Sequence, residues 1–189
     1  MIRVAVVDDH HAVRLGLHAA LEFEPDMEPV GEATSAAELA PLMYRTSPDV
    51  VVVDYRLPDE DGLTLCRRVK RQPPAPAILL HSAFADDWIT LPAVLAGVNG
   101  IVHKGAPGRE LAEAIRTVAG GGTALPDLLP EFLTAASEAV DAEDRPILGM
   151  LVHGTSHAEI GRVLRTSTSD VQRRIDRMLG RLRVTIPAG

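Results

Sequence analysis

Five polar residues in the N-terminal part of the chain stand directly after apolar runs: Asp8, Asp9, Asp54, Ser82 and Lys104. Three carboxylates in one cleft repel one another, and a hard divalent cation such as Mg²⁺ relieves that repulsion by taking oxygen ligands. A carboxylate can then act as the nucleophile toward a phosphoryl group, while a lysine neutralises the transferred oxygens and a hydroxyl donates to one of them. These residue types predict a Mg²⁺ site and phosphoryl transfer to one of the carboxylates.

The pattern of apolar residues predicts the elements that bring these side chains together. Short apolar runs alternate with stretches of helical period, which is typical of a parallel sheet flanked by helices. The expected strands cover residues 2–7, 28–33, 50–53, 77–81 and 100–103. The expected helices cover residues 12–23, 35–45, 62–71, 86–96 and 107–119. An acidic pair after one strand is more often only a helix N-cap, but in a doubly wound sheet of order 2-1-3-4-5 all five polar residues converge on one edge.

A second, smaller unit is expected toward the C-terminus. The glycines at 120–122, with Pro126 and Pro130 beyond them, interrupt the alternating pattern and mark a linker. Three short amphipathic helices follow, marked by Ile147, Leu148, Leu151 and Val152, by Ile160, Val163 and Leu164, and by Val171, Ile175, Met178, Leu179 and Leu182. We therefore expect an α/β domain at 1–119, a linker at 120–140 and a small all-α domain at 141–189.

Local signals predict the ends of these C-terminal helices. Asp141 with Asp144, and Ser167 with Asp170, have the spacing of a capping box, in which each member satisfies a free backbone group of the other. Gly154 stands where the first of the three helices is expected to end.

Composition excludes several classes of protein. Of the 189 residues, 46% are apolar and 24% are charged, which is the balance of a globular domain and not of a disordered or collagenous chain. No apolar run approaches the roughly 20 residues that cross a bilayer, and the single cysteine, Cys66, can form neither an internal disulfide nor a cysteine-based zinc site. We therefore expect a cytoplasmic protein.

Charge is distributed unevenly along the chain. Residues 1–140 carry 20 acidic and 11 basic side chains, a net charge of -9, whereas residues 162–183 carry seven arginines against Asp170 and Asp176, a net charge of +5. The overall charge of -7 disfavours a nucleic-acid partner, but the basic C-terminal segment is suited to one.

The N-terminal part, to about residue 120, resembles a response-regulator receiver domain, which has a flavodoxin-like fold. The matching segments are VVDDH at 6–10, VVVDYRLPDEDG at 51–62, LLHSA at 79–83 and HK at 103–104. The resemblance implies that Asp54 is the phosphoacceptor and that Asp8 and Asp9 complete the Mg²⁺ site with it. It further implies that Ser82 is the switch hydroxyl and that Lys104 contacts the phosphate.

The C-terminal part resembles the LuxR-type helix-turn-helix of the NarL/FixJ regulators, over LVHGTSHAEIGRVLRTSTSDVQRRIDRMLGRLRV at 151–184. The family places its base-reading side chains at the positions of Gln172, Arg173 and Asp176. Arginine and glutamine can bond guanine and adenine edges with two hydrogen bonds each. The arginines of the same helix that we expect on DNA phosphates are Arg174, Arg177 and Arg181.

The two resemblances predict a two-component response regulator and not an enzyme. A histidine kinase would phosphorylate Asp54, and the protein, a homodimer at least when activated, would change its binding to double-stranded DNA. A second hypothesis is a regulator that binds DNA independently of phosphorylation, because Ile101 replaces the usual aromatic switch residue and Pro92 interrupts the fourth helix. A phosphohydrolase is disfavoured, because its second acid would stand at position 56, which is Arg56.

Overall fold

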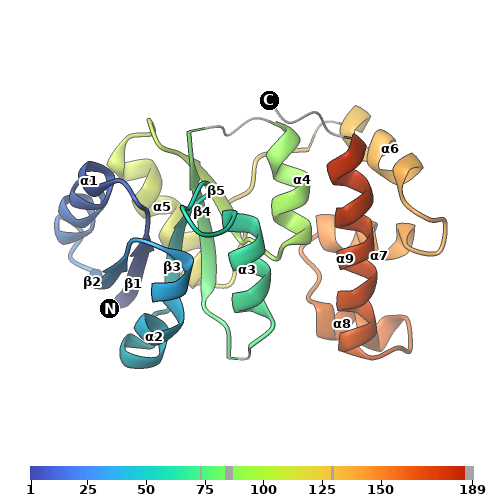
Figure 1. The fold of residues 1–189 in the computed structure, drawn as a ribbon, viewed down its shortest axis with the longest axis horizontal. Helices are drawn as coiled ribbons and strands as arrows, with labels where there is room; N and C mark the ends of the chain where they lie inside the picture. Colours follow the sequence, from blue (N-terminus) through green and yellow to red (C-terminus); the bar gives the residue numbers. More distant parts are fainter. Residues whose placement is uncertain (73, 84–86, 129, 186–189) are drawn as a thin grey trace. The chain divides into compact units, whose positions relative to one another are not determined.

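The computed structural model describes residues 1–72, 74–83, 87–128 and 130–185, and in it the first part of the chain forms a five-stranded parallel sheet (Figure 1). The strands are β1 (Ile2–Val7), β2 (Met27–Ala33), β3 (Val50–Asp54), β4 (Ala77–Ser82) and β5 (Gly100–His103). They lie in the order β2-β1-β3-β4-β5. The predicted fold class and strand order are confirmed.

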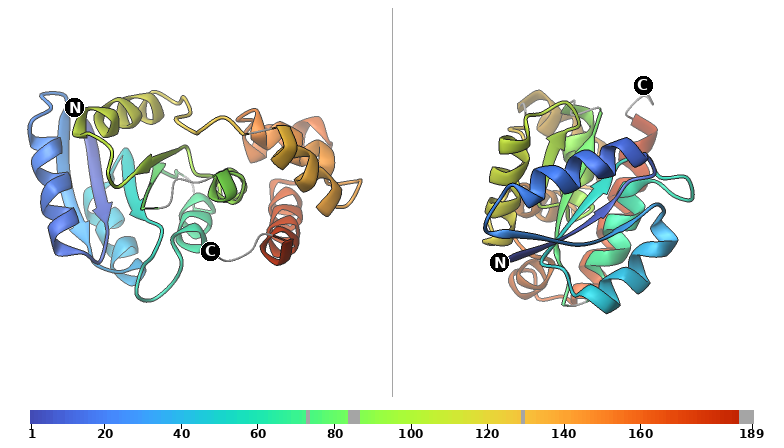
Figure 2. Two further views of the ribbon diagram at one scale, coloured as in Figure 1. Left: turned by 90° about the horizontal axis from the view of Figure 1, so that it is seen from above. Right: turned by 90° about the vertical axis from the view of Figure 1, so that its left-hand side faces the viewer.

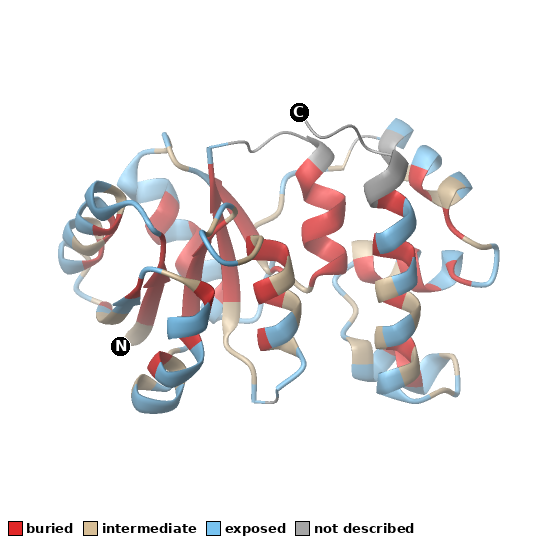
Figure 3. Cartoon of the chain, in the orientation of Figure 1, coloured by how far each residue is buried: buried red, intermediate tan, exposed pale blue. Residues whose placement is uncertain are grey.

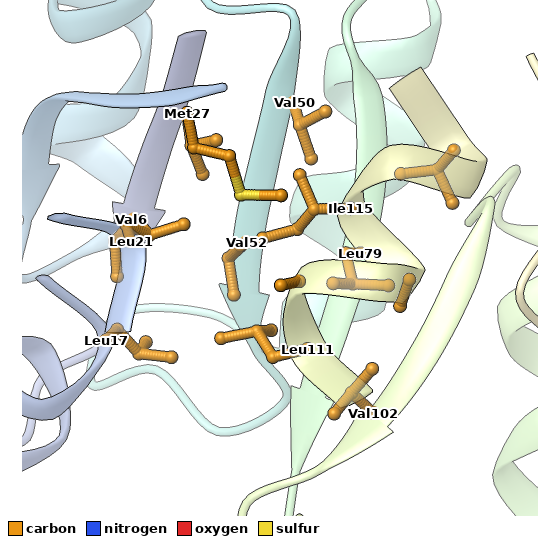
Figure 4. Packing of buried hydrophobic residues seen from close by; sticks show 14 residues of the cluster. Val6, Leu17, Leu21, Met27, Val50, Val52, Leu79, Val102, Leu111 and Ile115 are labelled. Carbon is orange, nitrogen blue, oxygen red and sulfur yellow. The ribbon is translucent and has the colours of Figure 1, made fainter. Parts of the chain in front are cut away.

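Four helices cover the two faces of this sheet: α1 (His11–Glu22), α2 (Ala36–Thr46), α3 (Gly62–Lys70) and α5 (Gly108–Ala119). The face with Val52 and Leu79 packs against Leu17 of α1 and against Leu111 and Ile115 of α5 (Figure 4). The views in Figure 2 show α2 and α3 on the opposite face. The central strands therefore lie between two apolar layers, which explains why β3 is an unbroken run of valines.

Strand register brings the carboxyl ends of four strands to one edge of the sheet. Val7 pairs with Val53, Asp54 with His81, and Ser82 with His103. Because the strands are parallel, the residues that follow them emerge at the same edge, as the sequence predicts.

The remaining helices form a second compact unit. It comprises α4 (Asp87–Leu95), α6 (Pro130–Ala139), α7 (Arg145–Val152), α8 (His157–Val163) and α9 (Thr168–Thr185). Helix α9 packs against α4, α6 and α8. The buried side chains of this unit include Ile147, Ile160, Ile175, Met178 and Leu182. Each short helix thus contributes a few apolar residues to one shared core.

The structure adds detail to the predicted boundaries. Contacts group residues 1–85 with 96–126, and residues 86–95 with 127–189, so α4 belongs with the C-terminal helices. Helix α6 occupies much of the segment expected as a linker. The 1–119, 120–140 and 141–189 division stays a prediction.

Two of the predicted helix ends are confirmed and one is wrong. Gly154, with φ of 77°, follows α7, and its amide donates to the carbonyl of Leu151. Ser167 Oγ accepts the amide of Asp170 at the start of α9, which is one half of the predicted capping box, whereas the Asp170 carboxylate bonds Thr166 and Arg173. No capping box forms between Asp141 and Asp144, because α7 begins at Arg145 and the Asp144 carboxylate bonds an arginine of α9 instead.

Figure 3 shows where residues are buried: the central strands β3 and β4 are almost wholly buried, the edge strand β2 is only partly buried, and α1, α2 and α9 each have exposed residues. Within the described residues, the helices are all too short or too polar to cross a membrane.

Candidate functional site

The carboxyl ends of β1, β3 and β5 place one lysine between two buried carboxylates. Lys104 Nζ lies 2.7 Å from Asp8 Oδ2 and 2.8 Å from Asp54 Oδ2. Asp8 is 1% exposed and Asp54 is 3% exposed. Residues far apart in sequence therefore form one compact cluster of two acids and a base.

Backbone and side-chain contacts hold Asp8 in this position. The amide of His10 donates to Asp8 Oδ1 at 2.8 Å. The buried Arg14 donates from Nη1 to the Asp8 carbonyl at 2.9 Å and from Nε to Glu32 Oε2 at 3.0 Å. Asp9 points to a different partner, because its Oδ1 lies 2.6 Å from His10 Nδ1. Asp8 is thus fixed in the protein, and the exposed Asp9 is accessible to solvent.

Asp54 and Lys104 affect each other's pKa. Burial raises the pKa of Asp54 and the negative charge of Asp8 adds to the effect, although Lys104 partly opposes both. Burial acts against the charged form of Lys104, but hydrogen bonds to Asp54 and Asp8 outweigh it and raise the pKa of the lysine. A further cation in this cluster would favour ionised Asp54.

A cavity of about 200 Å³ opens beside Asp54. Its lining includes Lys104, Ser82, Tyr55 and Arg56. The amide of Arg56 donates to Asp54 Oδ1 at 3.3 Å. Asp54, Ser82 and Lys104 thus line one space that is open to a small ligand.

The loop after β3 is held so that Asp54 keeps this position. The amide of Gly62 donates to the Tyr55 carbonyl at 2.8 Å, and a Cβ at residue 62 would lie 2.3 Å from the Asp54 carbonyl oxygen. Only glycine permits that approach. Asp59 accepts the amides of Ala36 and Ala37 at the start of α2. Asp59 thus links this loop to α2, whereas Asp54 lines the pocket.

The acidic residues of the pocket suit a divalent cation. One ligand atom each from Asp8, Asp9, His10 and Asp54 lies within 4.8 Å of the others. Carboxylate oxygens are the ligands preferred by Mg²⁺, whereas a histidine nitrogen suits softer metals. The donor set of Asp8, Asp9 and Asp54 therefore fits the predicted metal.

His81 is a pocket neighbour that sequence reasoning missed. It is 6% exposed at the end of β4, and its Nδ1 atom has no hydrogen-bond partner within the described structure. Burial lowers the pKa of His81 to about 4, and the charge of Lys104 adds to this effect. The signal was a histidine ending an otherwise apolar run, but only the register with Asp54 shows its relation to the pocket.

The predicted DNA-contacting residues all lie on α9, where they differ in exposure. Arg173, Arg177 and Arg181 are exposed, whereas Gln172 and Asp176 are half-buried. Arg173 Nη2 donates to Asp170 Oδ1 at 2.7 Å, one helical turn earlier. The DNA-contacting roles of these residues stay predictions.

Three of the α9 arginines contact an acidic turn formed by Asp141, Glu143 and Asp144. Arg174 Nε donates to Asp144 Oδ1 at 2.6 Å, and Asp144 is 1% exposed. Arg177 lies 3.5 Å from Asp144 and 3.6 Å from Glu143, and Arg181 bonds Asp141. Arg174 is only 18% exposed, so its pair is largely buried, whereas the pairs of Arg177 and Arg181 with Glu143 and Asp141 are open to water.

The two departures from the receiver pattern are visible in the structure. Ile101 lies in β5 and is buried. Pro92 lies inside α4, which spans nine residues. A proline there removes one helical hydrogen bond, because it has no backbone N–H.

Known proteins are similar to this chain over both its N-terminal and its C-terminal part. The model of the response regulator receiver domain matches residues 4–116. DevR/DosR of Mycobacterium tuberculosis, described as a DNA-binding transcriptional activator, is 34% identical over 96% of this chain and 88% of its own. The transcriptional regulatory protein LiaR of Bacillus subtilis is 31% identical over 98% of this chain and 92% of its own.

Solved structures show the same fold. The receiver domain of the putative response regulator NarL from Mycobacterium tuberculosis has a TM-score of 0.61 and 32% identity, covering 64% of this chain and 97% of that one. A LuxR-family two-component response regulator from Aurantimonas has a TM-score of 0.62 and 32% identity, covering 72% of this chain and 95% of that one. The chain therefore belongs to the response regulators of the NarL/LuxR type and carries their receiver domain.

Proposed function

We propose that this protein takes a phosphoryl group from the phosphohistidine of a histidine kinase onto Asp54, and that phosphorylation changes its binding to promoter DNA. The observation that carries the proposal is the position of Lys104 Nζ, within 2.8 Å of both Asp8 and Asp54, beside a cavity that Ser82 also lines.

The pocket supplies what phosphoryl transfer needs. An Asp54 oxygen forms a bond to phosphorus while the bond from phosphorus to the donor nitrogen breaks, so the acceptor must be ionised and the transferred oxygens need neutralisation. Lys104 supplies one positive charge at the acceptor. The Ser82 hydroxyl lines the same cavity and would donate to a phosphoryl oxygen.

Asp8, Asp9 and Asp54 would hold Mg²⁺. When bound, the ion supplies charge neutralisation at the phosphoryl oxygens and relieves the repulsion among the three carboxylates. The close approach of their ligand atoms supports this assignment.

The basic helix α9 would contact DNA. Arg173 and Gln172 would read base edges, and Asp176 would accept from a cytosine amino group. Arg181 would exchange the partly exposed Asp141 for a phosphate at small cost, because a surface ion pair contributes only about 0–1 kcal/mol. Arg177 would exchange the exposed Glu143 in the same way and would also give up its 3.5 Å contact with the buried Asp144. Moving Arg174 onto a phosphate would remove the shorter of the two arginine contacts of the buried Asp144, so we assign Arg174 first to the fold.

A second candidate function is DNA binding that does not depend on phosphorylation. It is favoured by Ile101, because the buried isoleucine offers no aromatic ring whose rotamer could report the state of Asp54. In that case the pocket would bind metal but would not control α9.

Purified protein treated with Mg²⁺ and acetyl phosphate tests the proposal. Intact-mass measurement should show one phosphoryl adduct in the wild type and in Asp59→Asn, a matched change in the same loop, but none in Asp54→Asn. DNA affinity and sedimentation should then change on phosphorylation, with a homodimer in the phosphorylated state. An adduct that survives Asp54→Asn contradicts the assignment, and an adduct without effect on DNA affinity favours the second candidate.

A further inference from the structure

Asp170 joins the turn of the helix-turn-helix to the predicted base-reading arginine. Its Oδ2 accepts the Thr166 hydroxyl at 2.9 Å, and its Oδ1 accepts Arg173 Nη2 at 2.7 Å. Thr166 lies between α8 and α9, and Arg173 lies on α9. One carboxylate therefore has each oxygen bonded to a different side chain.

This arrangement is not what helix capping alone requires. Ser167 accepts the amide of Asp170 at 3.1 Å, which is one half of a capping box. In the other half, the carboxylate at position 170 would reach back to the amide of the capping residue. Here one carboxylate oxygen accepts from Thr166 and the other from Arg173, so Asp170 has a role in addition to helix capping.

The contact with Asp170 orients Arg173 and leaves most of its hydrogen-bond donors available. The Arg173 side chain is 73% exposed, and the bond to Asp170 uses one of the five N–H groups of the guanidinium. Two of the remaining groups suffice for a guanine edge. A long arginine side chain loses much rotamer freedom on binding, and holding it beforehand lowers that cost.

We propose that Asp170, anchored by Thr166, is a positioning residue that presents Arg173 to a base edge and thereby sets sequence discrimination at one base pair. The proposal rests on the proposed DNA-binding function of α9. Removing the charge of Asp170 should then lower discrimination at one base pair, whereas removing an acid that only competes for Arg173 would raise it.

The test starts from the wild-type full chain, phosphorylated as above, and a pool of randomised duplexes. Arg173→Ala should relax one position of the selected site, with a loss of about 5- to 150-fold in discrimination there. Asp170→Asn keeps the shape of the side chain and removes its charge. It should lower discrimination at that same position by about 3- to 10-fold, while binding to a duplex outside the selected site becomes slightly tighter because one negative charge is gone.

Three further variants distinguish a positioning role of Asp170 from an effect of its charge or of its contribution to folding. Thr166→Val removes the anchor without changing charge, so discrimination should fall while binding to the unselected duplex stays constant. Glu159→Gln on α8 removes the same charge elsewhere in the unit and should tighten binding to both duplexes alike. In the Arg173→Ala background, Asp170→Asn should cause no further loss of discrimination, because the residue acts through Arg173.

The proposal is overturned if Asp170→Asn tightens selected and unselected duplexes equally, or if it lowers discrimination further when Arg173 is already absent. It is also overturned if discrimination falls in proportion to a lower melting temperature, which indicates a structural role. A wild-type protein that enriches no sequence overturns the DNA-reading function and this role together, whereas a selected site insensitive to Asp170→Asn overturns only this role.

Discussion

In the receiver unit Lys104 contacts two carboxylates that are almost fully buried, whereas in the helical unit Arg181 and Arg177 meet Asp141 and Glu143 in contact with water. A buried charge loses its hydration, so removing its only counter-ion is costly, while an exposed pair is exchanged for water or another anion with little change in free energy. The receiver cluster is therefore suited to bind a specific ion or phosphoryl group, and the surface arginines are suited to exchange partners.

The buried pair of Arg174 with Asp144 shows that burial, and not the type of residue, decides how readily an arginine can change its partner. Arg174 and Arg177 are three positions apart on one helix and both approach Asp144. Only Arg174 is largely buried.

The largest effect is expected on removing the lysine of the receiver pocket. Lys104→Met leaves Asp8 and Asp54 buried together without the lysine that pairs with both, and it should lower the free energy of unfolding at pH 7 by about 3–5 kcal/mol in urea denaturation without Mg²⁺. Adding Asp54→Asn to this variant should recover part of the loss. A loss under about 1 kcal/mol would mean that the cluster behaves like a surface pair.

Mg²⁺ should stabilise the wild type through the same cluster. At 100 times its dissociation constant a ligand contributes about 2.7 kcal/mol to the folded state. Asp9→Ala should abolish the rise in melting temperature that Mg²⁺ causes, as followed by calorimetry. A rise that persists in this variant would locate the metal elsewhere.

The two arginines that approach Asp144 should differ in their effect on stability. Arg174→Met should lower the stability of the helical unit by about 2 kcal/mol, because Asp144 remains buried with a single, more distant cation. Arg177→Met should cost less than about 1 kcal/mol. Hydrogen exchange of α7 and α9 amides measures both changes, and equal effects would contradict the distinction by burial.

Stability should depend on pH through His81. The pKa of His81 in the folded protein, about 4, is below its ordinary value, so the unfolded chain binds the proton more readily. The stabilisation is complete above the unfolded pKa and is lost as pH falls toward 4, with a decrease of about 1 kcal/mol between pH 7 and 5.5. Urea midpoints of the wild type and His81→Gln should diverge accordingly, and parallel curves would remove His81 from this role.

The smallest effect is expected at an exposed arginine of α9. If Arg177 exchanges the exposed Glu143 for a DNA phosphate, Arg177→Ala should weaken binding to all duplexes similarly and reduce the slope of log affinity against log salt by about one. Fluorescence anisotropy at several salt concentrations measures the slope. An unchanged slope would mean that Arg177 remains with the acidic turn when DNA binds.

The sheet, its order and the edge at which Asp54, Ser82 and Lys104 meet could be predicted from the sequence. Apolar runs, the continuous valines at 50–53 and the polar residue after each run are local signals, and a parallel sheet allows few arrangements of them. Which charged side chains form ion pairs with one another could not be predicted in this way. Asp141 and Asp144 have capping-box spacing, yet the structure places them on arginines 30 to 40 positions away.

The fold class, the family resemblance and the acids and lysine of the pocket follow from the amino-acid sequence alone, because each depends on periodicity or on a motif within a short segment. Three further features are visible only in the folded chain: Lys104 lies between Asp8 and Asp54, His81 is buried near them, and Arg174 bonds Asp144. Burial and ion pairing depend on contacts between distant segments, and the free energy of a charge is set by those contacts and not by its neighbours in sequence.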